Sequence, residues 1–199
     1  VEIHNAAEAE RLYQEIVDSE FSVRQLKIGS KAKSPAPPFT TSTLQQEAAR
    51  KLGYPVALTM RIAQSLYESG HITYMRTDSM NLSQLCLNSS KKVIVEQMGA
   101  EYHKRRTYQT KTKGAQEAHE AIRPTVITLT PAEVKPYLTP DQFKVYRIIW
   151  ERFTASLMSA CVQDTRTVDI AANDYIFRAS GYTVKFDGFT AVYQDTNEN

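Results

Sequence analysis

The chain has 199 residues, of which 42% are hydrophobic and 23% are charged, and its formal net charge is +2 at pH 7. This composition is that of an ordinary globular protein, and no apolar run approaches the roughly 18 residues that a membrane helix needs. The first residues are polar and acidic, unlike a signal peptide. Cys86 and Cys161 have no metal-like spacing, so we expect reduced thiols in a cytosolic protein.

The positive charge is clustered. Residues 22–33 carry four basic side chains and residues 102–113 carry five, and neither stretch has an acidic one. Tyr102 and Tyr108 lie within the second stretch. Basic residues interleaved with aromatics suit a phosphate backbone, although a solvated loop explains each stretch equally well. Because the chain starts abruptly at VEIHN, we also expect a domain excised from a longer protein.

The N-terminal part predicts one helix and one strand. Asn5 and Glu8 form a capping box for a helix over 6–18. A loose alternation predicts a strand over 20–28. The stretch 29–38, GSKAKSPAPP, has the glycine, serine and prolines of a linker, so we place a domain boundary there.

Two helices and a short strand are expected next. The first helix has a capping box at Ser42 and Gln45 and ends at Gly53. The second begins near Pro55 and ends at Gly70. Its expected inward face comprises Ala63, Leu66 and Tyr67. The strand HITYMRT follows at once, and this order is that of a winged-helix unit.

More helices follow in the middle of the chain. A third helix is predicted over 83–98, closed by a glycine, and a short helical stretch over 114–123, halted by a proline. Capping boxes with proline at the first helical position lie at 130–133 and 139–142, and the second opens a helix over 140–158 with a clear apolar face.

The last part of the chain changes to strand periodicity. Residues 160–193 alternate between apolar and polar, with turn signals at Asn173-Asp174 and Asp187-Gly188. The fold class is therefore α+β, a mainly helical winged-helix-like (CAP-like) domain inserted into a partial antiparallel β domain. The expected boundaries are 38–158 for the helical domain, and 1–37 with 159–199 for the β domain.

The segment with the most distinctive chemistry is the short strand. In a strand, Ile72, Tyr74 and Arg76 would share one face, which makes the phenol and the guanidinium neighbours. A tyrosine with a pKa near about 10 is a poor nucleophile, and an adjacent cation favours its phenolate. The guanidinium also matches phosphate geometry, so the pair suits attack on a phosphodiester. The competing interpretation is a half-buried strand aromatic, Tyr74, beside a surface arginine.

Three long motifs carry a family resemblance. They are ITYMRTDSMNLS (72–83), preceded by PFTTSTLQQEAARKLGY (38–54) and followed by AQEAHEAIRPT (115–125), with FDGF at 186–189. In this order they resemble the active-site region of bacterial type IA DNA topoisomerases, the topoisomerase I group. The resemblance covers nearly the whole chain, and Met75 favours the topoisomerase I branch over the topoisomerase III branch.

The resemblance implies a mechanism and a set of residues. Tyr74 would attack single-stranded DNA to form a 5′-phosphotyrosyl link, and resealing after strand passage would need no ATP. Arg76 would bind the scissile phosphate, and His119 matches a family histidine near that phosphate. Arg123 is a further DNA-contact candidate, although it could equally cap helix carbonyls. Asp78 and Ser79 would form the turn that exposes the tyrosine.

The resemblance also implies partners beyond these residues. The family uses Mg²⁺ held by a separate acidic domain, but no DxDxD-like cluster occurs in this sequence. The EAHE stretch fails the zinc pattern HExxH because residue 123 is arginine, so no metal ligand is assigned. We expect single-stranded or negatively supercoiled DNA as substrate, the metal-binding domain of the same polypeptide as partner, and a bacterial cytoplasmic, nucleoid-associated location. These residues alone would then be inactive.

Two other functions stay open. A non-catalytic winged-helix module could use Tyr74 to stack on a base of single-stranded DNA. A tyrosine recombinase or type IB enzyme would instead join tyrosine to a 3′-phosphate, but its larger set of Arg, His and Lys residues is not found. Covalent attachment and its polarity distinguish the three.

Overall fold

The computed structural model describes residues 2–108 and 119–194. It comprises six α-helices, three β-strands in one sheet and three short 3-10 helices, so the fold is α+β as expected. The chain forms two compact units, Val1–Lys33 with Val162–Phe186 and Ser34–Cys161 with Asp187–Asn199. We call them the sheet unit and the helical unit. The expectation of a β domain at 1–37 and 159–199 stays a prediction about the intact protein.

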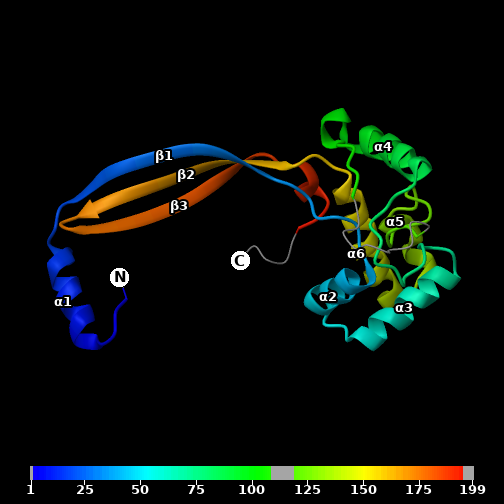
Figure 1. Cartoon of the computed structure of the whole chain (residues 1–199), viewed down its shortest axis with the longest axis horizontal. Helices are drawn as coiled ribbons and strands as arrows, with labels where there is room; N and C mark the ends of the chain where they lie inside the picture. Colours follow the sequence, from blue (N-terminus) through cyan, green and yellow to red (C-terminus); the bar gives the residue numbers. More distant parts are fainter. Residues whose placement is uncertain (1, 109–118, 195–199) are drawn as a thin grey trace. The chain divides into compact units, whose positions relative to one another are not determined.

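The sheet unit consists of one helix and three long strands. Helix α1 (Ala6–Val17) leads into β1 (Phe21–Lys33), and β2 (Cys161–Ala172) pairs antiparallel with β3 (Tyr175–Phe186) in the strand order β1-β2-β3 (Figure 1). The β2–β3 turn uses Asn173 at φ 51°, and the side-chain amide of this residue donates to the Glu15 carbonyl of α1 at 2.7 Å. The helix is thereby held at the turn.

Two predictions in this unit need correction. The strand predicted over 20–28 runs on to Lys33, so the first five residues of the expected linker are strand. The reason is tertiary, because β1 lies beside β2 in the sheet, and pairing overrides the weak strand propensity of Gly and Lys. Asn5 does cap α1 by accepting from the Glu8 amide, but Glu8 returns to the amide of His4 rather than to Asn5.

The helical unit contains the other helices. They are α2 (Thr41–Leu52), α3 (Val56–Glu68), α4 (Gln84–Met98), α5 (Pro131–Val134) and α6 (Pro140–Ser156), with 3-10 turns η1 (Ala100–Tyr102), η2 (Lys135–Tyr137) and η3 (Gly188–Ala191). The predicted capping boxes of α5 and α6 are confirmed, as are the N-cap of α4 at Ser83 and its end at Gly99. No helix in the described residues is both long and apolar enough to cross a membrane.

Helix α2 begins differently from the prediction. Its N-cap is Thr40, whose side chain pairs reciprocally with Thr43, so the capping box is not at Ser42 and Gln45. Gly53 ends the helix in the left-handed conformation at φ 68°, as expected. In α3, Ala63 and Leu66 are buried as predicted, whereas Tyr67 is exposed. That tyrosine reappears at the candidate site below.

The core of the helical unit surrounds α6. Tyr146, Ile149 and Phe153 of this helix are almost fully buried. One buried cluster joins α6 to α2 and α3, and a second joins it to α4 and to the segment after β3. Both cysteines are free and buried. Helix α6 is thus the central helix of the helical unit, and both buried clusters pack on it.

The segment after β3 packs into the core of the helical unit, to which it belongs. The expected hairpin turn at Asp187-Gly188 is wrong, because a 3-10 helix starts there. A Cβ on Gly188 would lie only 2.5 Å from the Ala160 carbonyl oxygen, and its φ is 52°, so glycine is required. Phe189 and Tyr193 are then buried in the core. The Tyr193 hydroxyl donates to the buried carboxylate of Glu47 on α2.

Candidate active site

Tyr74 lies in an irregular extended segment, not in a strand. The predicted strand 71–77 is wrong, since only Ile72 forms an isolated bridge, to Pro124. Ile72 is buried rather than sharing the face of Tyr74. From Tyr74 onward, however, the residues alternate: Tyr74 and Arg76 are exposed, and Met75 between them is buried. The phenol and the guanidinium therefore both face outward.

The start of α2 holds this segment from one side. The Thr41 amide donates to the Thr77 carbonyl at 2.8 Å, and the Thr77 amide donates back to the Thr41 hydroxyl at 2.8 Å. The same hydroxyl donates to the Met75 carbonyl at 2.8 Å. The backbone and hydroxyl of Thr41 thus supply the hydrogen bonds that a neighbouring strand would otherwise make. This explains why the segment is extended without a strand partner.

Residues 121–125 hold it from the other side. The Thr73 amide donates to the Arg123 carbonyl at 2.9 Å, and the Thr73 hydroxyl donates to the Ala121 carbonyl at 2.7 Å. The helix predicted over 114–123 is wrong where the structure describes it, because Ile122 and Pro124 form bridges to Phe39 and Ile72; residues 114–118 lie outside the described residues. Tyr74 thus lies between two fixed parts of the backbone, with Thr73 held before it and residues 75–77 held after it.

The ring of Tyr74 has two aromatic neighbours. Tyr67 of α3 meets it edge-on with ring centroids 5.2 Å apart, and the His119 ring lies 6.4 Å away. Tyr74 remains 43% exposed, so its side chain is accessible to a large substrate. The structure therefore brings together two of the residues selected from sequence, Tyr74 and His119. It adds Tyr67, which the sequence analysis had assigned to the core.

Arg76 lies over the exposed face of α3. It lines a hollow of about 460 Å³ together with Arg61, Gln64 and Glu68 of that helix. After Arg76 the chain turns toward the interior, and a side-chain hydroxyl stabilises the turn: the Ser79 amide donates to Thr77 Oγ1 at 3.0 Å. Ser79 is buried, so a serine anchors the turn after Arg76.

Arg123 is occupied by internal partners. Its Nε donates to Glu120 Oε2 at 3.1 Å and its Nη1 to the carbonyl of Pro124 at 2.9 Å. Glu120 also accepts from the Ser83 amide at 2.7 Å, at the start of α4. Burial alone would raise the pKa of Glu120, but the hydrogen bonds from Ser83 and the charge of Arg123 outweigh it and lower the pKa. The DNA-contact role of Arg123 stays a prediction beside this carbonyl-binding role.

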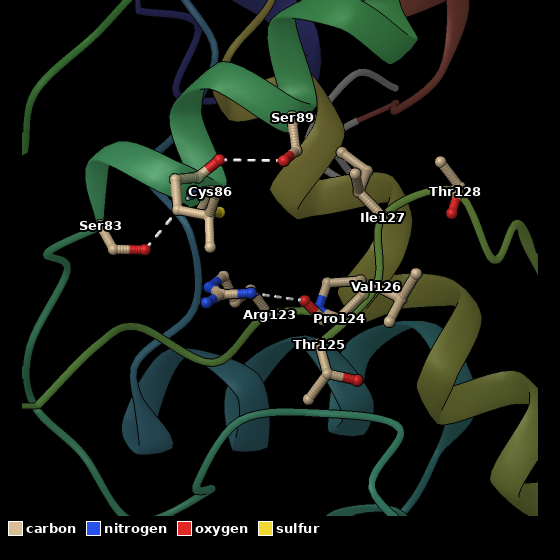
Figure 2. A pocket seen from close by; sticks show the side chains of 10 residues that line it. Ser83, Cys86, Ser89, Arg123, Pro124, Thr125, Val126, Ile127 and Thr128 are labelled. Carbon is tan, nitrogen blue, oxygen red and sulfur yellow. Dashed lines mark hydrogen bonds between the residues drawn. The ribbon is translucent and has the colours of Figure 1, made fainter.

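A second hollow, of about 220 Å³, lies behind this ion pair. Figure 2 shows Cys86 of α4 on one wall, Arg123 and Pro124 on the other, and Ile127 beside them. Burial raises the pKa of the Cys86 thiol, which keeps it protonated and unreactive near neutral pH. Neither Tyr74, Arg76 nor His119 lines this hollow.

Part of the basic stretch 102–113 serves the scaffold. Arg106 donates to the Met158 carbonyl, and the Tyr108 hydroxyl donates to the Ser156 carbonyl at 2.6 Å. These side chains satisfy carbonyl groups at the end of α6, where a helix leaves them unpaired. Residues 109–113 lie outside the described residues. A direct role in phosphate binding is thus weakened for Arg106 and Tyr108.

The arrangement offers an exposed phenol, a nearby imidazole and two exposed guanidinium groups. Within residues 2–108 and 119–194, no three acidic, histidine or cysteine side chains are grouped so that they could hold a metal ion. The site therefore has the parts for nucleophilic attack on a phosphodiester and for phosphate binding, and the described residues add no group of metal ligands to it.

Comparisons with known proteins show which proteins this chain is similar to. The family model described as DNA topoisomerase matches residues 1–199. Proteins named DNA topoisomerase 1 from two strains of Xylella fastidiosa, 9a5c and Temecula1 / ATCC 700964, are 44% identical over 98% of the chain. The solved full-length topoisomerase I from Thermotoga maritima is 38% identical over 96% of the chain, with a TM-score of 0.82. The chain spans about a quarter of the length of these curated relatives and a third of that solved chain.

Proposed function

The chain belongs to the bacterial type IA DNA topoisomerases, and from this premise we propose that it supplies the nucleophile that cleaves and rejoins one DNA strand. The observation that supports this most directly is the placement of Tyr74. It is exposed, it faces an imidazole, and hydrogen bonds from Thr41 and Thr73 fix the backbone on both sides of it. A nucleophile must be both accessible and rigidly positioned.

The proposed reaction is a transesterification. The phenolic oxygen of Tyr74 loses its proton and attacks the phosphorus of a phosphodiester, and the bond from phosphorus to the 3′ oxygen breaks. The DNA end with the 5′ phosphate stays on the tyrosine, and the other end leaves as a 3′-hydroxyl after taking up a proton. One ester bond is exchanged for another, so the reverse reaction reseals the strand without ATP.

Arg76 and His119 support the reaction at the phosphate. Arg76 would bind a non-bridging oxygen of the scissile phosphate, because a guanidinium forms charge-assisted bonds to phosphate. His119, whose ring faces Tyr74, would contact the same group. Arg123 is the weakest of the proposed DNA contacts because Glu120 neutralises it. Magnesium, which the full-length family members use, would have to be held by residues other than those described here.

Strand passage and domain organisation complete the proposal. We propose that α2, α3 and the segment 71–77 form a winged-helix-like (CAP-like) unit inserted into a β gate domain. The other strand would pass through the gap while Tyr74 holds the cut end, which would relax negatively supercoiled DNA in the bacterial nucleoid. The 199 residues alone would bind DNA weakly and would not relax it, since they contain no acidic metal cluster among their described residues.

One alternative has a specific observation in its favour. Tyr67 and Tyr74 form an exposed aromatic pair, and such a pair can stack on bases of single-stranded DNA without any bond being broken. In that case the chain would be a non-catalytic binding module. The two functions differ in whether DNA becomes covalently attached.

The test uses the intact enzyme that contains this chain. It is incubated with Mg²⁺ and a single-stranded oligonucleotide labelled at the 5′ or the 3′ end, and the reaction is stopped with detergent. We expect labelled protein only with the 3′ label, and none with Tyr74→Phe. Tyr137→Phe serves as a matched control, because it removes the hydroxyl of a tyrosine that is 82% exposed and lies in η2, outside the candidate site.

Other outcomes would reject the proposal. Protein labelled from the 5′ end means a 3′-phosphotyrosine and therefore a recombinase-like or type IB reaction. Tight DNA binding without any covalent product favours the stacking module. Relaxation of supercoiled DNA by the 199 residues alone, with Mg²⁺ present, would show that no further metal-binding domain is needed.

A further inference from the structure

The hollow beside Arg76 has a strongly polar rim. Two guanidinium groups line it, that of Arg76 and that of Arg61, with the side chains of Gln64 and Glu68. The Gln64 amide donates to Glu68 Oε1 at 2.8 Å, so the single carboxylate is partly occupied. Two positive charges against one negative charge leave the hollow net positive, which suits an anionic ligand.

These two arginines differ from most others in the helical unit. Arg123 is paired with Glu120, Arg147 with Glu151, and Arg152 donates to the Pro37 carbonyl. Within the part of the chain that the structure describes, neither Arg61 nor Arg76 has a hydrogen-bond or ion-pair partner. Exposed guanidinium groups that converge on one hollow without a partner are available to an external ligand.

The hollow is also next to the nucleophile. Arg76 is two residues from Tyr74, and Tyr67, whose ring touches that of Tyr74, lies on the same helix as Arg61. At about 1.5 Å rise per residue, Arg61 is about 9 Å along α3 from Tyr67. Ala57 and Met60 add apolar surface to the hollow, which suits the carbon face of a sugar.

From this placement we infer that the hollow binds the DNA phosphate next to the scissile one, and that Arg61 is its main ligand. This inference rests on the proposed function, because it takes Tyr74 as the cleavage position. Arg61 holds the strand by a charge-assisted contact one phosphate away, while Arg76 remains at the scissile phosphate. The contact orients the substrate without touching the reacting atoms, so Arg61 is a positioning residue.

The test measures DNA binding separately from cleavage. The intact enzyme carrying Tyr74→Phe is titrated with a single-stranded oligonucleotide at several salt concentrations, with and without Arg61→Gln. We expect Arg61→Gln to weaken binding about tenfold at low salt and to reduce the slope of log affinity against log salt by about 0.7. Arg147→Gln on α6 makes the same charge change at a residue that is 48% exposed and paired, and it should leave both values unchanged.

A second measurement identifies the phosphate. Each phosphodiester in turn is replaced by a neutral methylphosphonate. At one position next to the cleavage site, the replacement should weaken DNA binding by the protein that retains Arg61. It should not weaken binding further when the protein carries Arg61→Gln, because the two changes remove the same contact. In the Tyr74-containing enzyme, Arg61→Gln should raise the DNA concentration needed for half-maximal covalent product and leave the rate at saturating DNA nearly unchanged.

Several results would overturn the inference. Additive effects at every phosphate would mean that Arg61 touches none of them. An unchanged DNA affinity together with a lower unfolding temperature would mean that Arg61 binds another part of the same protein. Since binding is measured without the tyrosine hydroxyl, failure of the proposed cleavage would appear separately, as the absence of covalent product.

Discussion

The two compact units of this chain differ in how they bury their apolar residues. The helical unit places large side chains such as Tyr146, Phe153 and Leu44 almost completely out of solvent. In the sheet unit, neither β1 nor β3 has a single buried residue, and Val23 and Ile28 of β1 are 67% and 70% exposed. The helical unit therefore carries its own core, whereas two of the three strands in the sheet leave nearly all their side chains in solvent.

This difference matters for the candidate site. Tyr74, Arg76 and His119 all belong to the helical unit, and the hydrogen bonds that fix Tyr74 come from Thr41 and Thr73 of the same unit. The proposed nucleophile thus belongs to the unit that has its own buried core. A rigid scaffold of this kind is what positioning of a reactive group requires.

Separating the units should give the largest effect. Val162 and Phe186 are paired across the sheet, so residues 162–186 can be replaced by a short Gly-Ser linker, and residues 2–33 can be removed. We expect this helical variant to unfold cooperatively by circular dichroism. Residues 2–33 joined to 162–186 should show no cooperative transition, because an isolated three-stranded sheet without a packed face is barely stable.

The opposite outcome would remove the basis of the comparison. If the sheet unit unfolds cooperatively alone and the helical variant does not, the exposed strands stabilise the chain in a way that burial does not reveal. The full 199-residue chain, studied in the same buffer, is the control for both.

A matched pair of core substitutions sharpens the comparison. Leu44 of α2 is fully buried and Leu26 of β1 is 53% exposed. We expect Leu44→Ala to lower the free energy of unfolding by about 2–5 kcal/mol, since it leaves a cavity. Leu26→Ala should cost under about 1 kcal/mol. Urea denaturation of both variants measures the difference, and equal losses would mean that Leu26 is covered in solution.

Acid titration compares one ion pair from each unit. Glu120 is held by Ser83 and Arg123, and Asp169 in β2 is held by Arg178, which is 62% exposed. Both carboxyl pKa values are lowered. Each pair therefore stabilises the fold above the ordinary carboxyl pKa of about 4, and that stability is lost as the pH falls through the lower folded-state value.

The pair in the helical unit should dominate this loss. We expect Glu120→Gln to lower the free energy of unfolding at pH 7 by about 1–3 kcal/mol and to flatten its decline below about pH 4. Asp169→Asn should change the same curve less, because its partner is solvated. Equal curves for the two variants would contradict the argument from the partner arginines, whose side chains are 13% exposed for Arg123 and 62% exposed for Arg178.

The sequence predicted the helices better than the candidate site. Local signals were sufficient where side chains act on their own turn, as in the capping boxes at Thr130 and Thr139 and the ends at Gly53 and Gly99. Tyr74 and Arg76 were identified as chemically unusual, and the alternation that exposes both is real from Tyr74 onward.

The errors arise where distant residues decide the local structure. The segment 71–77 is extended because Thr41 and residues 121–125 satisfy its backbone, and no local pattern shows these partners. Bridges from Ile122 to Phe39 and from Pro124 to Ile72 likewise make residues 122–124 extended instead of helical. Tyr67 has the periodicity of a core residue but contacts Tyr74 at the surface. The only feature of the sequence that could have indicated this surface position is that Tyr67 is a large aromatic residue near the polar C-terminal end of its helix.

The central claim is that Tyr74 itself carries the DNA, and a direct identification of the modified residue tests it. Tyr67 is equally exposed and its ring lies 5.2 Å from that of Tyr74, so loss of activity in a Tyr74 variant alone could reflect a disturbed neighbour. The covalent product of the intact enzyme is trapped with detergent, digested, and sequenced by mass spectrometry. The account predicts a 5′-linked nucleotide on Tyr74 alone. A nucleotide on Tyr67, or on any other residue, would contradict it.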